Sequence, residues 1–254
     1  MELAEKFAGG GTLLHRLDPR VKLIVAAVFS ILVAVSDRLP PLLLALGFSL
    51  ALVAFARLNL WQVIRRLAVP NAFVLLLWLT LPITVPGTPA AKIGPAVLSQ
   101  EGIDRCLLVT LKVNAIVAAL IALLNTSRIL DLAHAARHLG VPDKLVMIFF
   151  FCVRYIHVIA SEYRRLRDAM KVRAFKPRTN MHTYRTYAGL LGMLLVRSHE
   201  RAERVYEAML CRGFRGKFNL LSHFKLKPVD CLAGFAMLCF VAVLGYFQWH
   251  PITF

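Results

Sequence analysis

Residues 21–56 read VKLIVAAVFSILVAVSDRLPPLLLALGFSLALVAFA, which is two apolar runs separated by the polar turn Ser36–Asp37–Arg38. Each run approaches the ~20 residues that a helix needs to cross the hydrocarbon core of a bilayer. A chain in lipid must satisfy its backbone hydrogen bonds internally, which favours helices in such runs. The stretch therefore predicts two membrane-spanning helices, over Val21–Ser36 and Leu39–Ala56. We expect Lys22, at the start of the first, to extend its ammonium group to the lipid headgroups.

Three further apolar runs extend this pattern along the chain. They cover Leu67–Val85, Cys106–Leu124 and Cys231–Phe247. Pro70 and Pro82 lie within the first of these, so we expect that helix to be kinked or broken near both ends. The sequence thus predicts an all-α integral membrane protein with about five transmembrane helices.

The composition supports a membrane protein with a basic face. Hydrophobic residues make up 58% of the 254 residues, charged residues 18%, and the net charge is +17; the mean hydropathy is +0.64. These values exclude a disordered, collagen-like or small disulfide-linked chain. The charge is segregated from the apolar runs, so we expect no nucleic-acid partner. The five cysteines have neither C-x-x-C nor zinc-site spacing.

The placement of the basic residues predicts the orientation in the membrane. Lys and Arg number four in residues 1–22, one in 37–40, three in 57–66, two in 86–105, and 20 in 127–228. Loops rich in Lys and Arg stay in the cytoplasm. We therefore expect a multi-pass membrane protein with the N-terminus and residues 127–228 cytoplasmic and the C-terminus extracytoplasmic.

Residues 127–228 have a different, helical pattern. They contain 20 basic and seven acidic residues, a net charge of +13. Capping signals predict a short helix over Arg128–Leu139, a long one from Pro142 to about Phe175, and another over His182–Arg212. Each long helix begins apolar and ends charged. We expect both to be amphipathic and to lie along the inner leaflet; a simple interfacial anchor to anionic lipid is the alternative.

The two long helices end in closely similar sequences. Residues 168–176 read DAMKVRAFK and residues 207–215 read EAMLCRGFR, so both follow the form acid-Ala-Met-x-x-Arg-small-Phe-basic. Attraction to anionic lipid requires positive charge but no specific sequence motif. A repeated motif instead suggests two equivalent binding sites on a partner protein.

Each motif position has an expected role in docking. Arg173 and Arg212 provide planar, permanently charged forks for carboxylates or helix-end carbonyls. Small residues at the next position, Ala174 and Gly213, keep the helix end thin. The following residues of the two motifs, Phe175 and Phe214, would anchor it through apolar contacts. An arginine that merely complements the helix dipole is the alternative for either one alone.

The chain resembles the transmembrane T component of energy-coupling factor (ECF) transporters, which are ABC-type importers, and is most similar to the cobalt-transport branch. The resemblance rests on the opening His15-Arg-Leu-Asp-Pro-Arg-Val-Lys22, the four spans followed by cytoplasmic helices, and two Ala-Arg-Gly-type motifs. Here these motifs read Val172-Arg173-Ala174 and Cys211-Arg212-Gly213, so both depart from the family form at the first position and one also at the third.

The resemblance implies a coupling subunit of a prokaryotic inner membrane, without enzymatic activity. The two long helices would cross and place each arginine motif in a groove of a cytoplasmic ATPase dimer, whose closure would drive a separate substrate-binding, metal-capturing membrane subunit. A small accessory membrane subunit is a further implied partner. ATP and magnesium would bind the ATPase, and this chain would bind no cofactor. Cobalt is the implied cargo; nickel or a vitamin such as biotin is the alternative.

Other candidate sites are weaker. His134 and His138 share a helix face but lack a third metal ligand, so we expect no metal site. Lys112 and Asn114 are polar residues within a predicted span, and we expect their partners on other spans. Acidic residues of the long helices suggest a membrane-bound enzyme only weakly, because their spacing is too sparse to hold magnesium (Glu162, Glu200, Glu203 and Glu207). A lipid-surface scaffold is the remaining alternative.

The organisation that we expect is therefore a four-span membrane region over residues 1–126, coupling helices over 127–228, and a C-terminal transmembrane helix over 229–254.

Overall fold

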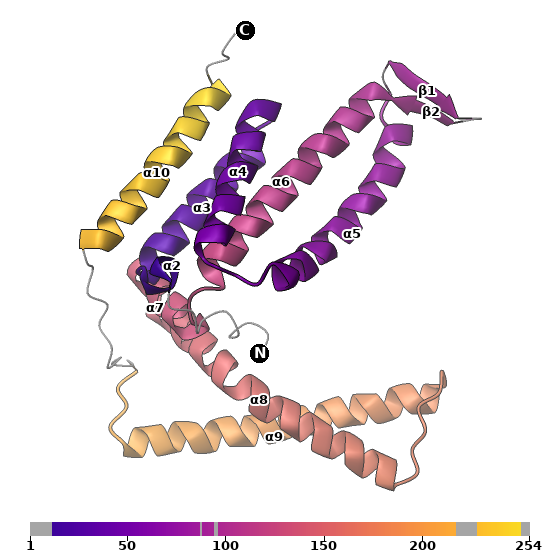
Figure 1. The fold of residues 1–254 in the computed structure, drawn as a ribbon. Helices are drawn as coiled ribbons and strands as arrows, with labels where there is room; N and C mark the ends of the chain where they lie inside the picture. The colour runs from indigo at the N-terminus through magenta and orange to yellow at the C-terminus, as the bar shows by residue number, and fades with distance from the viewer. Residues whose placement is uncertain (1–11, 87, 94–95, 217–227, 250–254) are drawn as a thin grey trace. The chain divides into compact units, whose positions relative to one another are not determined.

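The computed structural model describes residues 12–86, 88–93, 96–216 and 228–249. The chain divides into two compact units, Met1–Leu139 with Phe224–Phe254, and Gly140–His223. Helices of the first unit, drawn in Figure 1, are α2 (Leu13–Arg16), α3 (Pro19–Val35), α4 (Leu39–Phe55), α5 (Leu60–Thr84), α6 (Gln100–Leu124), α7 (Ile129–His138) and α10 (Pro228–Trp249). The second unit contains α8 (Asp143–Val172) and α9 (Met181–Cys211).

The all-α membrane fold is confirmed, and the five predicted spans correspond to α3, α4, α5, α6 and α10. Within the described residues, length and composition qualify α5, α6, α8 and the Asp230–Trp249 part of α10 to cross a membrane. Helices α3 and α4 have 17 residues each, or about 26 Å, which is the lower limit for a span. The apolar first half of α8 explains why this predicted coupling helix also qualifies.

Helix α5 is longer than the predicted span and remains unbroken. It contains Pro70 and Pro82 within one 25-residue helix, and Figure 1 shows it curving along its length. We expected a kink or a break near both prolines; the helix is not broken at either one, and it is curved instead. Neighbouring side chains in a bundle commonly compensate the backbone groups that proline frees.

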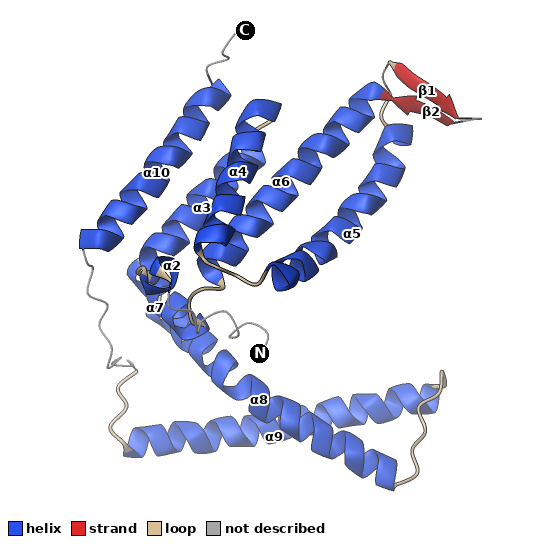
Figure 2. Ribbon diagram, in the orientation of Figure 1, coloured by secondary structure: helices blue, strands red, loops and turns tan. Residues whose placement is uncertain are grey.

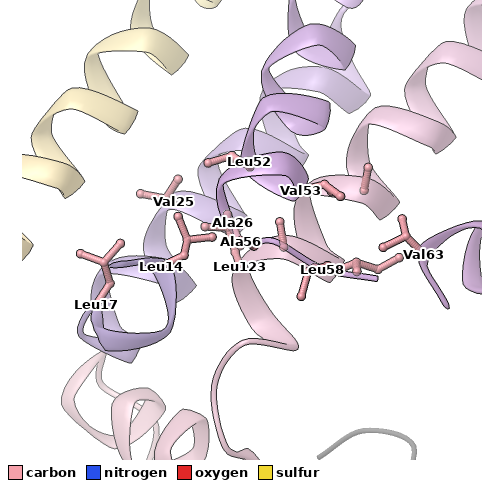
Figure 3. Packing of buried hydrophobic residues seen from close by; sticks show 13 residues of the cluster. Leu14, Leu17, Val25, Ala26, Leu52, Val53, Ala56, Leu58, Val63 and Leu123 are labelled. Carbon is pink, nitrogen blue, oxygen red and sulfur yellow. The ribbon is translucent and has the colours of Figure 1, made fainter. Parts of the chain in front are cut away.

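Helix α6 is the centre of the first unit, packing against α3, α4 and α5. Its contact face is built from small side chains that are fully buried, among them Ala115, Ala119 and Ala122. Small residues let helices approach closely in a bilayer, where packing rather than the hydrophobic effect drives association. Figure 3 shows one of the resulting clusters, in which Val25 of α3, Leu52 of α4 and Leu123 of α6 converge.

A β-hairpin joins α5 to α6, as Figure 2 shows in red. Strand β1 (Pro89–Ile93) pairs antiparallel with β2 (Ala96–Ser99). The sequence does not reveal this hairpin, because such short segments carry too little pattern to distinguish strand from loop. Beside it, Gly102 lies so close to α5 that a Cβ atom would come within 2.8 Å of the Pro82 Cα atom.

A buried lysine stabilises the end of the first unit at which α3 begins and α6 ends. Lys22 of α3 is only 1% exposed. Its ammonium group donates to the Ser127 hydroxyl at 2.8 Å and to the Thr126 hydroxyl at 3.2 Å. Lys22 thus ties α3 to the segment between α6 and α7.

Three carboxylates complete the surroundings of this lysine. Asp131, Asp230 and Asp18 all interact electrostatically with Lys22, and they come from α7, α10 and the N-cap of α3. The ammonium group of Lys22 thus has carboxylates near it in a region where an unpaired ion would be costly. Lys22 therefore lies inside the fold, and the expectation that its ammonium group extends to the lipid headgroups is wrong.

The same stretch explains much of the opening motif from His15 to Lys22. Asp18 accepts a hydrogen bond from the Arg20 amide at 2.9 Å and so caps α3, and Pro19 occupies the first helical position, where proline is favoured. The motif therefore starts α3 and places Lys22 one turn later against Ser127.

Both polar residues within α6 have a partner on another span, as predicted; for Lys112 it is the Ala34 carbonyl oxygen of α3, at 3.0 Å. Asn114 exchanges hydrogen bonds with the Asn71 amide of α5, each at 3.0 Å. Lys112 donates to Asp37 at 2.8 Å, in the turn between α3 and α4, and this hydrogen bond lowers the pKa of the Asp37 carboxyl. Both residues thus link α6 to its neighbours.

We predict that Lys22→Met destabilises the protein by about 1.5–3 kcal/mol, because it removes two buried hydrogen bonds from a charged donor, to the Thr126 and Ser127 hydroxyls. Lys112→Met is the matched control: it also removes a lysine from an apolar helix, but the partner Asp37 is 82% exposed, so we expect a loss of at most about 1 kcal/mol. Thermal unfolding in detergent measures both. Equal melting temperatures for the two variants would contradict the assigned role of Lys22.

Candidate coupling site at the ends of helices α8 and α9

The end of α8 is a Schellman cap. The Phe175 amide donates to the Met170 carbonyl oxygen at 3.1 Å, and the Ala174 amide donates to the Lys171 carbonyl oxygen at 3.0 Å. These are the 6→1 and 5→2 hydrogen bonds of that motif. They require a left-handed residue at Ala174, whose φ is 60°, a conformation that costs a residue with a Cβ atom about 1–2 kcal/mol.

The end of α9 repeats this geometry. The Phe214 amide donates to the Met209 carbonyl oxygen at 3.0 Å, and the Gly213 amide donates to the Leu210 carbonyl oxygen at 2.9 Å. Gly213 has a φ of 79°, which glycine adopts without a steric penalty. The two motifs thus have the same backbone structure, although 39 residues separate their arginines.

The cap accounts for part of the repeated sequence. It places the shared Met at the third position from the helix end and the shared Phe just beyond the cap, the pair whose side chains commonly make contact in a Schellman motif. It also explains the small residue, which takes the left-handed conformation. The cap does not require an arginine. Arg173 and Arg212 occupy the C-cap positions, and both are exposed.

The guanidinium groups of both motif arginines are available for a partner protein. No ion pair with a described residue involves Arg173 or Arg212, whereas neighbouring charges such as Lys171 and Asp168 do pair, at 3.4 Å. Two helix ends of the same geometry therefore each carry a guanidinium group that no described carboxylate engages. Such a group can form two parallel hydrogen bonds with a carboxylate.

The aromatic residues of the motifs are half-buried within the second unit. The Phe175 ring lies 6.0 Å from that of Tyr187 in an edge-to-face arrangement and 6.1 Å from His182, both on α9. Phe214, at the end of α9, shares a cavity wall with Tyr155 of α8. Phe175 thus packs against α9, whereas Phe214 faces a cavity that α8 also lines.

Helices α8 and α9 cross (Figure 1), and an ion pair links them. Arg197 of α9 donates to Glu162 of α8, and Arg165 lies 3.7 Å from the same carboxylate. The Glu162 side chain is only 13% exposed. Sequence spacing contains no sign of this pair, because its members are 35 residues apart and the angle between two helices is not encoded locally.

The weaker candidates do not gather into a site. His134 packs edge-to-face on His138 with ring centroids 4.9 Å apart. No group of three or more His, Cys, Asp or Glu suited to a metal occurs among the described residues. Glu162 is engaged by arginines, and Glu203 pairs with His199 at 3.4 Å. These carboxylates are thus surface or crossing residues rather than an assembled acidic centre.

Comparison with known proteins identifies the family. Residues 10–223 match the CbiQ family, described as cobalt transport protein. The energy-coupling factor transporter transmembrane protein EcfT of Thermosediminibacter oceani is 25% identical, over 96% of this chain and 97% of that protein. EcfT of Leuconostoc gelidum subsp. gasicomitatum is 26% identical, over 93% and 95% of the two chains, and EcfT of Brevibacillus brevis 23%, over 96% and 97%.

These relatives are named as transporter membrane proteins, which fits the expectation that the chain is not itself an enzyme. The family match includes helices α3 to α6 and both capped arginine motifs. The chain belongs to the CbiQ cobalt transport protein family, and over almost its whole length it is similar to transmembrane proteins of energy-coupling factor transporters.

Proposed function

We propose that this chain couples ATP hydrolysis in a cytoplasmic ATPase dimer to a separate substrate-binding membrane subunit. One observation supports this above all: two helices end in the same Schellman cap, and each cap presents an exposed arginine that pairs with no described residue. Two helix ends with the same structure would fit the two equivalent binding sites of a dimer. ATP and magnesium would bind the ATPase, and this chain would bind no cofactor.

The crossing of α8 and α9 suggests how motion would pass between the two capped helix ends. Arg173 and Arg212 would each hold an acidic group or a helix-end carbonyl of one ATPase subunit. Closure of the dimer would then move the two helix ends. Glu162 and Arg197 join the helices at their crossing, so this contact would pass movement of one helix to the other.

Cobalt is the cargo that we propose, because the family that matches is described as cobalt transport protein. The capture of the metal would belong to the partner membrane subunit, with a small accessory membrane subunit as a further component of the complex. We also propose an inner-membrane location with a cytoplasmic N-terminus and an extracytoplasmic C-terminus, on the basis of the Lys and Arg distribution.

We predict that Arg173→Glu and Arg212→Glu each reduce the amount of ATPase that copurifies with the tagged chain in mild detergent, and that the double variant abolishes it. Each change replaces a cation with an anion facing the socket, and losing a charge-assisted hydrogen bond costs about 1.5–3 kcal/mol, or roughly tenfold or more in affinity. Quantitative mass spectrometry of the purified complex measures the loss.

The matched control is the double variant Arg164→Glu and Arg185→Glu, which makes the same charge change at exposed positions of α8 and α9 outside the motifs. We expect this control to retain most of the ATPase. Full copurification of the ATPase with Arg173→Glu/Arg212→Glu would exclude docking through these arginines.

The proposed orientation predicts that a reporter fused after Phe254 is active only outside the cytoplasm. Alkaline phosphatase, which needs the periplasm to fold, should be active in this fusion, and a fluorescent protein that fails to mature there should be dark. The reverse pattern would mean that an even number of helices crosses the membrane, with α8 as the first candidate for a further span.

A further inference from the structure

The two capped helix ends differ at the residue that takes the left-handed conformation. This residue is Ala174 in α8, with a φ of 60°, and Gly213 in α9, with a φ of 79°. Glycine adopts such a φ freely, whereas the Cβ atom of alanine makes it unfavourable. Ala174 is also exposed, so burial of its own side chain does not offset this strain. A strained conformation persists only where the surrounding contacts hold it, so the cap of α8 requires support from elsewhere in the chain.

The alternative to this cap is a longer helix. With Ala174 in the right-handed helical conformation, α8 would continue past Arg173. The hydrogen bond from the Phe175 amide to the Met170 carbonyl oxygen, which closes the cap, would be lost. Pro177 would stop the extension soon afterwards, because the residue before a proline disfavours the helical region. Arg173 would then lie within a helix instead of at its end, so the cap determines where this arginine is presented.

The aromatic ring of Phe175 makes the contact that opposes this extension. It lies 6.0 Å from the ring of Tyr187 at an angle of 78°, and 6.1 Å from the ring of His182. Aromatic pairs at this separation and angle attract each other by more than the area they bury. Because Phe175 directly follows Ala174, a change in the Ala174 backbone would carry the ring away from α9. The contact with α9 therefore favours the left-handed conformation.

A second contact fixes the linker between α8 and α9. The Arg178 amide donates to the Thr183 hydroxyl at 3.1 Å, and Thr183 is only 9% exposed. The Thr183 amide in turn donates to the Asn180 carbonyl oxygen at 2.9 Å. Near one end the linker is thus attached to the first turn of α9 by hydrogen bonds, and near the other end the ring of Phe175 lies on Tyr187. These two attachments hold the linker in the course that the cap requires.

We propose that Tyr187 is a positioning residue for Arg173. The ring of Tyr187 holds Phe175, this contact keeps Ala174 in the left-handed conformation, and the cap keeps the arginine at the end of α8. The proposal rests on the docking function proposed above for the arginine motifs. It gives Phe175 a contact within the chain, where the sequence predicts an anchor in the partner protein. The two docking ends are then stabilised differently, α9 by its glycine and α8 by an aromatic contact.

The variant Tyr187→Ala tests this role without changing either motif, and two measurements on the full chain in detergent follow it. Hydrogen exchange, read by mass spectrometry, reports opening of the cap through the Ala174 and Phe175 amides. We expect this exchange to become about two- to tenfold faster, because an aromatic pair is lost. We expect the ATPase to bind about two- to tenfold more weakly, because only the capped fraction of the chain is ready to bind.

Two control variants separate the ring contact from a general loss of an aromatic side chain. Tyr184 also lies on α9 but is 63% exposed, so Tyr184→Ala should change exchange and binding by less than about twofold. Tyr187→Phe keeps the ring and should behave like the wild type in both measurements. Equal effects of Tyr187→Ala and Tyr184→Ala, or unchanged exchange in Tyr187→Ala, would overturn the proposal.

The decisive variant adds Ala174→Gly to Tyr187→Ala. Glycine removes the strain of the left-handed conformation but cannot replace the lost aromatic contact. We therefore expect the double variant to recover exchange and ATPase binding to within about twofold of the wild type. Such recovery would show that the ring acts through the cap. A double variant as impaired as Tyr187→Ala alone would mean that the ring supports only the packing of the two helices, and would overturn the proposal.

The variant Arg173→Glu distinguishes failure of this proposal from failure of the docking function. Faster exchange in Tyr187→Ala with unchanged ATPase binding would overturn the positioning role of Tyr187. Loss of the ATPase in Arg173→Glu would then still support docking through the arginine. Retained ATPase in Arg173→Glu would exclude docking through this arginine, and with it any positioning role for Tyr187.

Discussion

The hydrogen bonds of the buried Lys22 ammonium group are the interaction on which the first unit most depends. They join α3 to Thr126 and Ser127, between the central helix α6 and the short helix α7. Lysine is expensive to bury in an apolar protein unless acceptors and counter-charges surround it. Here Asp18, Asp131 and Asp230 provide those charges from three further places in the chain. One side chain thus fixes where the spans end and α7 begins, the point from which the chain continues to α8.

In the second unit, the arrangement depends on the similar caps of α8 and α9 and on the place where the two helices cross. The Schellman caps stop α8 and α9 in the same way and leave one exposed arginine on each. Between the ends, Arg197 and Glu162 tie the helices together. A long helix transmits displacement well because its hydrogen bonds run along its axis. Caps that fix the ends and an ion pair that fixes the crossing are the features a mechanical coupling element needs.

The helices can be predicted well from the sequence because their signals are local. Apolar runs locate the spans, Gly140 and Gly213 mark helix ends, and the repeated motif by itself singles out Arg173 and Arg212. Features that depend on tertiary contact are not predictable in this way, because the Arg197–Glu162 pair and the burial of Lys22 both arise where helices meet. The small residue of each motif also has a role that the sequence did not suggest. Ala174 and Gly213 adopt the left-handed conformation of the cap, in addition to keeping the helix end thin.

The central claim is that ATPase closure moves the two capped helix ends. It is tested most directly by placing spin labels at Lys176→Cys and Arg215→Cys, just beyond the motifs, after replacing the five native cysteines. Pulsed electron resonance then measures the distance between the labels in the complex with the ATPase. We predict a distance that changes between the nucleotide-free complex and one trapped with ATP, and no change when ATP is added to this chain alone. An unchanged distance in the trapped complex would contradict the account.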